Sequence, residues 1–332
     1  MILYHIGYII VQQVIKNSFK FMNRQTIHRI VQALQNSEVR EFVRRSLKDN
    51  YKRYFTQNYK EAEELIDKSF NILARLVEDR STIYGFMEKI AIINDEIYKK
   101  DNNEFWFNRK YAEYKKNIRP KEDIKLISKF LNGKKILDFG TGGGYFALKL
   151  EKKGFILITS DILDYRIKEA EHLPFKKMYS PVDIKYLPKS IDIALMKTVL
   201  HHIDDEYILY ILDKLRKKVK RIIIKEDVVS VPRTIQRFRQ SYKTQPNLRK
   251  FLKMSRFNRK MCLFLFDFFG NVIAHGVSEI NLPFNFKSVS LWKKLFDSKG
   301  FKLKASIFSG FEKNKLHGNC QVWMVFDNKI KF

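Results

Sequence analysis

The feature that most limits the fold is a glycine-rich turn between a strand pattern and a helix pattern. Residues 135–139 form a short apolar run typical of a buried strand, and residues 145–153 have the pattern of a helix. Three glycines stand at alternate positions between them, Gly140, Gly142 and Gly144. Because glycine permits tight turns and close approach of a ligand to the backbone, this unit predicts a nucleotide-binding α/β domain.

Strand and helix patterns alternate after this turn. Apolar runs at 155–160, 191–196 and 221–225 read as strands, and 206–219 reads as a helix. Such alternation predicts a parallel sheet with helices on both faces. A further helix is expected at 289–298, and strands at 301–308 and 320–327 are expected to close one sheet edge as an antiparallel hairpin.

The glycine spacing narrows the kind of nucleotide. A dinucleotide-binding loop would place its third glycine at position 145, where Tyr145 stands. A phosphate-binding loop would end in Gly-Lys-Ser/Thr, which this turn lacks. The loop therefore favours an uncharged nucleoside over a pyrophosphate.

Three acids accompany the loop in order. Asp138 precedes the glycines, Asp161 ends the next strand, and Asp183 with Ile184 precedes the strand at 191–196. Residues 199–205, with sequence Val-Leu-His-His-Ile-Asp-Asp, follow that strand. This set resembles the class I S-adenosylmethionine-dependent methyltransferases, methyltransferase domain type 11, in the branch that contains quinone-biosynthesis enzymes.

The resemblance covers residues 118–230 well and implies both a fold and a cofactor. The fold is a Rossmann-like, seven-stranded, mostly parallel sheet, and the cofactor is S-adenosylmethionine. The resemblance implies that Asp138 holds the methionine ammonium, Asp161 the ribose hydroxyls, and Asp183 with Ile184 the adenine. A carboxylate can accept two hydrogen bonds from a vicinal diol, which suits the role implied for Asp161.

Polar residues after the fourth and fifth strands are candidates for the acceptor site, since sites form at the carboxyl ends of such strands. His201 and His202 either contact the acceptor or pack beneath the cofactor. Glu226 and Asp227 are candidate bases, with a plain surface turn as the alternative. Adjacent histidines point to different faces and no third ligand is placed, so we expect no metal site.

A second polar group is embedded among aromatic residues towards the end of the chain. Asp267 and Asn271 are four residues apart and would share one helix face. His275 is a further candidate base, because an imidazole titrates near neutral pH. With Asn285, these residues are expected either to line the acceptor pocket or to form a buried polar network.

The formal net charge is +28, part of which compositional bias towards lysine can explain. Local clustering is more informative. No acid occurs between Asp227 and Asp267, and an insert at about 230–265 carries ten basic residues, Arg233, Arg237, Arg239, Lys243, Arg249, Lys250, Lys253, Arg256, Arg259 and Lys260. This segment predicts contact with an anionic acceptor, RNA or an anionic membrane surface, or else a solvated helical face.

Residues 1–118 read as a helical N-terminal region, since apolar residues recur at helical spacing and Gly and Pro are nearly absent. The methyltransferase domain is expected at 119–332. The apolar start Met1–Ile15 is shorter than a membrane span and predicts a buried helix, with a peripheral membrane contact as the alternative. Two cysteines cannot form a disulfide framework, which favours a cytoplasmic protein.

We therefore expect a methyltransferase that acts on a small, anionic or amphipathic acceptor. Tyr145 and Phe146 offer aromatic faces to the cofactor's sulfonium. The first alternative is an RNA methyltransferase that uses the basic insert, although no Asn-Pro-Pro-Tyr-type tetrad follows the fourth strand. The second is a non-catalytic, cofactor-binding scaffold with a protein partner.

Overall fold

The computed structural model describes residues 24–54, 59–78, 113–178, 180–188, 190–274, 281–309 and 320–330. The chain forms two compact units, residues 1–108 with 253–284 and residues 109–252 with 285–332. Several sequence predictions lie outside the described residues, namely the helix at Met1–Ile15, the helical pattern from about residue 83 to 97, the turn at 310–318 and the position of His275.

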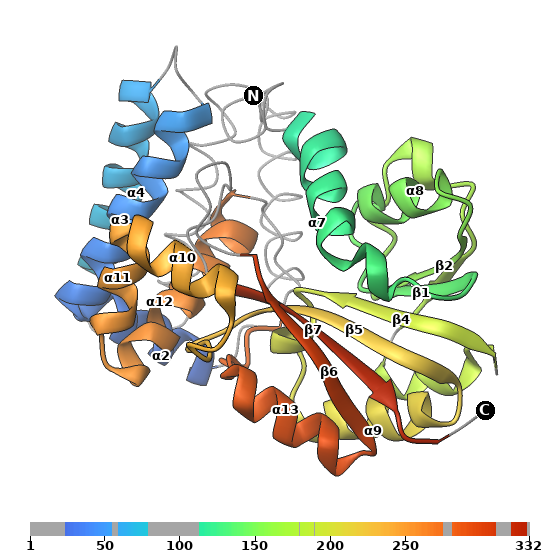
Figure 1. The fold of residues 1–332 in the computed structure, drawn as a ribbon. Helices are drawn as coiled ribbons and strands as arrows, with labels where there is room; N and C mark the ends of the chain where they lie inside the picture. The colour runs from blue at the N-terminus through green and yellow to red at the C-terminus, as the bar shows by residue number, and fades with distance from the viewer. Residues whose placement is uncertain are drawn as a thin grey trace, which may run out of the picture. The chain divides into compact units, whose positions relative to one another are not determined.

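The second unit contains a seven-stranded sheet with strand order β3-β2-β1-β4-β5-β7-β6 (Figure 1). β7 is antiparallel to both β5 and β6, and the other strand pairs are parallel. The predicted Rossmann-like, mostly parallel sheet is confirmed. The strands are β1 (Lys135–Phe139), β2 (Ile156–Asp161), β3 (Phe175–Lys177), β4 (Ile191–Lys197), β5 (Val219–Asp227), β6 (Phe301–Phe308) and β7 (Gln321–Asn328).

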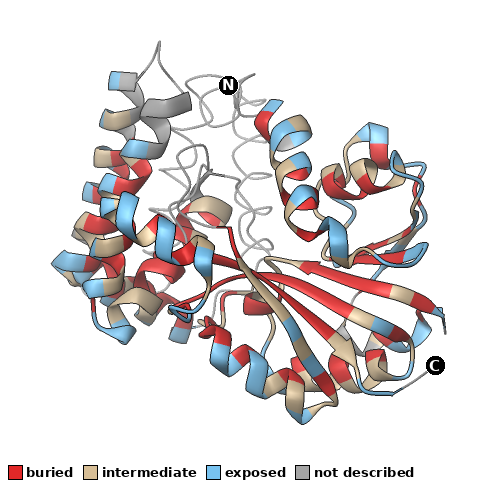
Figure 2. Cartoon of the chain, in the orientation of Figure 1, coloured by how far each residue is buried: buried red, intermediate tan, exposed pale blue. Residues whose placement is uncertain are grey.

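Helices cover both faces of this sheet (Figure 1). On one face, α7 (Arg119–Ile127) and α8 (Tyr145–Glu151) pack together, and Phe146 of α8 stacks on Trp323 of β7 with ring centroids 6.1 Å apart. On the other, Phe296 of α13 (Val289–Ser298) stacks on Phe326 of β7 at 4.0 Å, beside α9 (Asp205–Arg216). Residues three apart on a strand point to opposite faces, so β7 packs against both layers. The interior strands are buried along most of their length (Figure 2).

Short helices lie before and between the strands. η1 (Tyr114–Ile118) and η2 (Ser128–Phe130) precede β1, whereas η3 (Lys168–Ala170), η4 (Pro181–Tyr186) and η5 (Leu200–His202) follow β2, β3 and β4. The basic insert begins with α10 (Gln236–Thr244) and α11 (Pro246–Lys253). The sequence did not predict β3, because three residues with one half-buried side chain carry almost no periodic signal.

The described part of the first unit is helical. It contains α2 (Arg24–Gln35), α3 (Ser37–Tyr54), α4 (Tyr59–Glu78), α12 (Arg256–Phe268) and η6 (Phe269–Ala274). Aromatic contacts join its two chain segments, since Phe42 meets Phe266 at 6.3 Å and Phe70 stacks on Phe269 at 5.7 Å. None of the helices in the described ranges combines the length and apolarity that crossing a bilayer requires.

This grouping differs from the boundary expected at 118/119. Residues 253–284 pack with the N-terminal helices, and the basic insert is divided between the units after Leu252. The reason is visible in α12, where every residue from Met261 to Phe266 is buried. Because such a helix must be covered on all sides, the amphipathic helices α2 and α3 supply partners for it.

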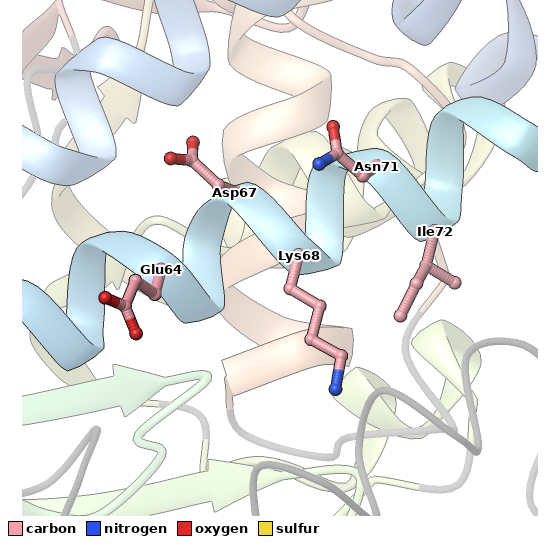
Figure 3. A pocket seen from close by; sticks show the side chains of 5 residues that line it. All are labelled: Glu64, Asp67, Lys68, Asn71 and Ile72. Carbon is pink, nitrogen blue, oxygen red and sulfur yellow. The ribbon is translucent and has the colours of Figure 1, made fainter.

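A shallow hollow runs along α4 (Figure 3). Side chains of a single helix line it, and Asp67 among them is already engaged by α3. Its two carboxylate oxygens accept from Arg44 Nη1 at 3.2 Å and Lys48 Nζ at 2.6 Å. The hollow is therefore the outer surface of an ion-paired helix pair. Its lining residues are Glu64, Asp67, Lys68, Asn71 and Ile72.

Candidate functional site

The three loop glycines have different structural roles. All have positive φ, at 72° for Gly140, 53° for Gly142 and 76° for Gly144. A Cβ added at Gly140 would lie 2.6 Å from a methyl of Val199, and one at Gly144 would lie 2.7 Å from Ala170. At Gly142 an added Cβ meets nothing within 4 Å. Gly140 and Gly144 therefore permit close packing, whereas Gly142 faces open space that a ligand can fill.

Two of the predicted acids hold this loop. The Thr141 hydroxyl donates to Asp138 at 2.8 Å, and the Gly142 N–H donates to Asp161 Oδ2 at 2.8 Å. The other oxygen of Asp161 accepts from the Ile162 N–H at 2.8 Å. Burial raises the pKa of both Asp138 and Asp161 above that of an ordinary aspartate. Both carboxylates stand beside the glycines, where the resemblance requires them.

Asp183 and Ile184 lie in η4. The Ser180 N–H donates to Asp183 Oδ2 at 3.0 Å, and Ile184 is fully buried. The second oxygen of Asp183 has no hydrogen-bond partner among the described residues. The adenine contact remains a prediction.

The carboxyl ends of β4 and β5 hold a buried carboxylate–imidazole pair. His201 Nδ1 lies 2.6 Å from Glu226 Oε2, and both side chains are almost completely buried. Glu226 Oε1 accepts from the backbone N–H groups of Val199 at 3.2 Å and Leu200 at 2.9 Å. With all these bonds in place, Glu226 positions the turn and the imidazole, and it does not face an acceptor as a base would.

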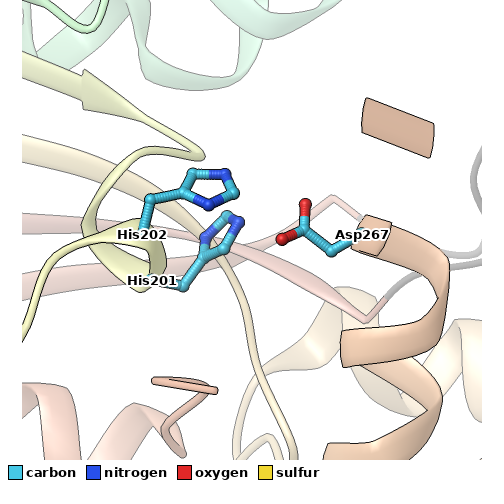
Figure 4. A group of neighbouring side chains, drawn as sticks. All are labelled: His201, His202 and Asp267. Atoms are coloured by element: carbon cyan, nitrogen blue, oxygen red, sulfur yellow. The ribbon is translucent and has the colours of Figure 1, made fainter. Parts of the chain in front are cut away.

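His202 lies against this pair. Its ring centroid is 4.1 Å from that of His201 (Figure 4). The ring of His201 also stacks on Phe286, at 5.0 Å between centroids. His202 is partly exposed where His201 is buried, so His202 presents the accessible imidazole. Asp267, drawn in the same figure, belongs to α12 and hence to the other compact unit.

Asp227 turns to the opposite sheet face from Glu226 and is buried there beside Lys225. Burial lowers the pKa of Lys225, and the charges of Asp123 and Asp227 oppose that shift only in part. Lys225 is fully buried, and its ammonium lies 2.7 Å from Asp123 of α7. Lys197, at the end of β4, lies 3.8 Å from the same carboxylate. Sequence reasoning missed Asp123, Lys197 and Lys225. A lysine inside an apolar strand pattern was the available signal.

Asn285 makes structural contacts. Its amide donates to the Ile203 carbonyl at 2.6 Å and to Asp205 Oδ1 at 2.8 Å. Lys287 joins the group through a 2.5 Å bond to Asp205. These bonds hold residues 285–287 against the turn that carries the histidines. Such contacts agree with the alternative that Asn285 forms part of a polar network. A role for Asn285 in lining the acceptor pocket remains a prediction.

Asp267 and Asn271 share a helix face as predicted. The Asn271 amide donates to the Asp267 carboxylate at 2.7 Å and to its backbone carbonyl at 3.1 Å. This contact spans the point where α12 passes into η6. Because the position of His275 lies outside the described residues, the convergence of the three side chains remains a prediction.

The basic insert is mostly exposed. Arg233, Arg239, Lys243 and Lys250 face solvent, while Phe238, Leu248 and Phe251 are buried. Arg249 has a structural part, since its guanidinium donates to the carbonyls of Tyr242 at 3.0 Å and Lys243 at 2.7 Å. It thereby caps the end of α10.

Phe146 does not offer its ring to a cofactor sulfonium. It is 3% exposed, and the Lys197 ammonium lies 4.5 Å from its ring centroid. The sequence prediction for Phe146 is wrong because α8 directs this side chain onto the sheet, where it stacks on Trp323. Tyr145, the next residue back, is half-buried and remains a candidate.

The described residues fit an adenosyl amino acid. The loop at Gly142 opens onto free space, and two carboxylates border it, the buried Asp138 and the partly buried Asp161. Asp161 at the end of β2 stands where ribose hydroxyls are bound in sheets of this kind. Asp138 provides an anion for an ammonium group.

Comparison with known proteins agrees with this fit. Residues 108–264 match the family model described as "Methyltransferase domain". No curated protein sequence matches the chain.

Solved structures give likenesses at low identity. A methyltransferase from Methanosarcina mazei is 15% identical with a TM-score of 0.40, covering 62% of this chain and 97% of its own. Magnesium protoporphyrin IX methyltransferase from Synechocystis, with the cofactor bound, is 12% identical with a TM-score of 0.41, covering 72% and 96%. A pyocyanin biosynthetic protein is 13% identical with a TM-score of 0.45, covering 85% and 72%.

At these scores the structural likenesses carry no argument about the acceptor. The domain match, with the glycine loop and its acids in the expected order, identifies the family and its cofactor, S-adenosylmethionine. The quinone-biosynthesis branch is not confirmed. Residues 108–264 form a methyltransferase domain, and its glycine loop and acids are those of the class I S-adenosylmethionine-dependent methyltransferases.

Proposed function

We propose that this methyltransferase acts on a small, anionic or amphipathic acceptor and that His202 accepts the proton that the acceptor loses. The bound cofactor supplies an electrophilic methyl group. The buried pair of His201 with Glu226, at the carboxyl ends of β4 and β5, is the observation that carries the proposal. Acceptors with a hydroxyl or acidic carbon need such a base.

The pair supports His202 by fixing its position. Glu226 binds the turn through two backbone N–H groups and holds the ring of His201. His201 in turn supports the ring of His202. Asn285 holds the carbonyl of Ile203, the residue that follows, so both sides of the turn are tied. A base fixed in this way needs little reorganisation to reach an acceptor proton.

The acceptor class is proposed from charge. Arg239 and Lys243 of α10 and Lys250 of α11 are exposed and belong to the same compact unit as the cofactor loop. Such a cluster attracts anions and raises their local concentration. RNA or an anionic membrane would meet the same charges, and the test below separates them. A cytoplasmic location fits Cys262 and Cys320, which are buried thiols.

The first experiment is a methyl-transfer screen with labelled cofactor against cell-extract fractions, divided into small molecules, RNA and lipids. We expect label in the small-molecule fraction. Label confined to RNA or lipid would contradict the proposed acceptor class. Absence of S-adenosylhomocysteine binding by calorimetry would contradict the activity itself.

The second experiment tests the base. His202→Ala should lower turnover by about 10²–10⁴-fold, the usual worth of a positioned base, with cofactor affinity preserved. The wild-type rate should fall as pH is lowered, because only the neutral imidazole accepts a proton. His172→Ala is the matched control, since His172 forms an exposed pair with Glu151 at 2.8 Å. Equal activity of both variants would exclude His202 as the base.

A further inference from the structure

Three charged side chains share one face of the sheet. In the strand register Asp138 of β1 lies opposite Leu195 of β4, and Lys197 lies opposite Lys225 of β5. Residues opposite each other in a parallel pair, and residues two apart on a strand, point to the same face. Asp138, Lys197 and Lys225 therefore all point towards the layer formed by α7 and α8.

The two lysines, Lys197 and Lys225, differ in the partners of their amino groups. Lys225 is fully buried and its Nζ lies 2.7 Å from Asp123 Oδ1. The Nζ of Lys197 lies 3.8 Å from Asp123 Oδ2, which is beyond hydrogen-bond distance. It rests on the ring of Phe146 instead. Among the described residues nothing accepts a hydrogen bond from this ammonium, although 20% of the side chain remains exposed.

An ammonium group has three hydrogen-bond donors, and burying them in largely apolar surroundings without acceptors costs free energy. Burial lowers the pKa of Lys197 to about 8. Among its charged neighbours, Asp123 and Asp138 raise this pKa, whereas Arg119 of α7 and Lys225 lower it. The side chain is thus a cation with spare donors, next to the buried Asp138.

A free α-amino acid end carries a carboxylate and an ammonium one carbon apart. A site for it needs a cation and an anion side by side, and Lys197 and Asp138 provide them at the edge of the glycine loop. We propose that Lys197 binds the α-carboxylate of S-adenosylmethionine while Asp138 faces its ammonium. The inference rests on the cofactor assignment and adds a carboxylate-binding residue on β4.

Calorimetry with two ligands tests this role without an acceptor. S-adenosylhomocysteine carries the amino-acid end, and 5′-methylthioadenosine is a similar nucleoside without it. Lys197→Met should weaken S-adenosylhomocysteine binding by about 10- to 100-fold, as expected for a lost charge-assisted bond, and leave 5′-methylthioadenosine binding within about twofold. Lys197→Arg should retain most of the affinity.

The matched control is Lys220→Met. Lys220 lies on β5 at the amino end of the sheet, pairs with Asp192 at 2.8 Å, and should affect neither ligand. Equal weakening of both ligands by Lys197→Met would show a structural role and overturn the inference. Unchanged S-adenosylhomocysteine affinity together with poorer acceptor binding would also overturn it. Failure of the wild-type protein to bind either ligand would contradict the cofactor assignment.

The pH dependence gives a second test that needs no apolar variant. The pKa of Lys197 is about 8 in the free protein, so this side chain loses its charge above that pH. The affinity of the wild type for S-adenosylhomocysteine should therefore decline above pH 8, relative to its affinity for 5′-methylthioadenosine. Lys197→Arg keeps its charge and should shift the decline to higher pH. If Lys197→Met fails to fold, this comparison decides the question. Identical profiles for the wild type and Lys197→Arg would overturn the inference.

Discussion

The two faces of the sheet at the end of β5 use adjacent residues for different purposes. Lys225 points towards α7 and forms a buried ion pair with Asp123, whereas Glu226 points to the other face and anchors His201. On the first face a lysine amine and a carboxylate contact each other inside the protein. On the second, a carboxylate satisfies two backbone N–H groups and a ring. One face therefore depends on charge balance, and the other on positioning.

The difference bears on function. A buried ion pair tolerates loss of one partner poorly, because the remaining charge is left without compensation. A carboxylate that anchors backbone and imidazole can be replaced by a neutral acceptor at smaller cost. We therefore expect the Lys225 face to govern folding and cofactor binding, and the Glu226 face to govern turnover.

The largest effect is expected from Asp123→Ala. It leaves Lys225 buried without its partner and should lower the free energy of unfolding by about 3–5 kcal/mol. Chemical denaturation measures this. The double variant Asp123→Ala with Lys225→Met should recover much of the loss. If Asp123→Ala is as stable as the wild type, the Lys225 face does not govern folding more than the Glu226 face does.

Glu226→Ala should cost less, about 2–3 kcal/mol, since two backbone N–H groups and His201 lose their acceptor. Glu226→Gln keeps an acceptor for the backbone and should cost about 1 kcal/mol. We expect turnover to fall in both variants, with S-adenosylhomocysteine affinity nearly unchanged. A loss of affinity larger than the loss of turnover would break the division between the faces.

Asp192 provides a contrast at the amino end of β4. The Lys135 N–H, the Lys220 ammonium and the Lys134 N–H lower its pKa to about 2. A lowered pKa stabilises the fold above the unfolded-state value near 4, and that contribution is lost as pH falls towards 2. Asp192→Asn should remove this acid-sensitive part, worth about 1 kcal/mol, in denaturation curves at pH 2–5. If the free energy of unfolding of Asp192→Asn depends on pH as it does in the wild type, the hydrogen bonds to Asp192 do not make this contribution.

The smallest effect expected is the coupling between the faces. Lys197→Met and Glu226→Gln should act additively on S-adenosylhomocysteine affinity, with a coupling energy below about 0.5 kcal/mol, because the groups share no partner. A double-mutant cycle by calorimetry measures it. A larger coupling would show that the two faces act as one site.

Local patterns in the sequence were sufficient for much of the fold. The bounds of β1, α13 and β6 agree with the expected ranges, since apolar periodicity and caps are properties of short segments. The glycine loop and its acids identified the cofactor because their spacing along the chain is itself the signal. β3 and the grouping of α12 with the N-terminal helices could not be predicted, because contacts distant in sequence decide them.

The sequence by itself determined the alternation of strands and helices apart from β3, the cofactor and the candidate residues at the strand ends. Only the tertiary structure decided what each candidate does. Glu226 was a candidate base until the turn after β4 brought His201 and two N–H groups to it, and Lys197 had no expected role until α7 and α8 enclosed it. The physical reason is that burial and partners, which set a polar group's chemistry, come from segments far apart in the chain.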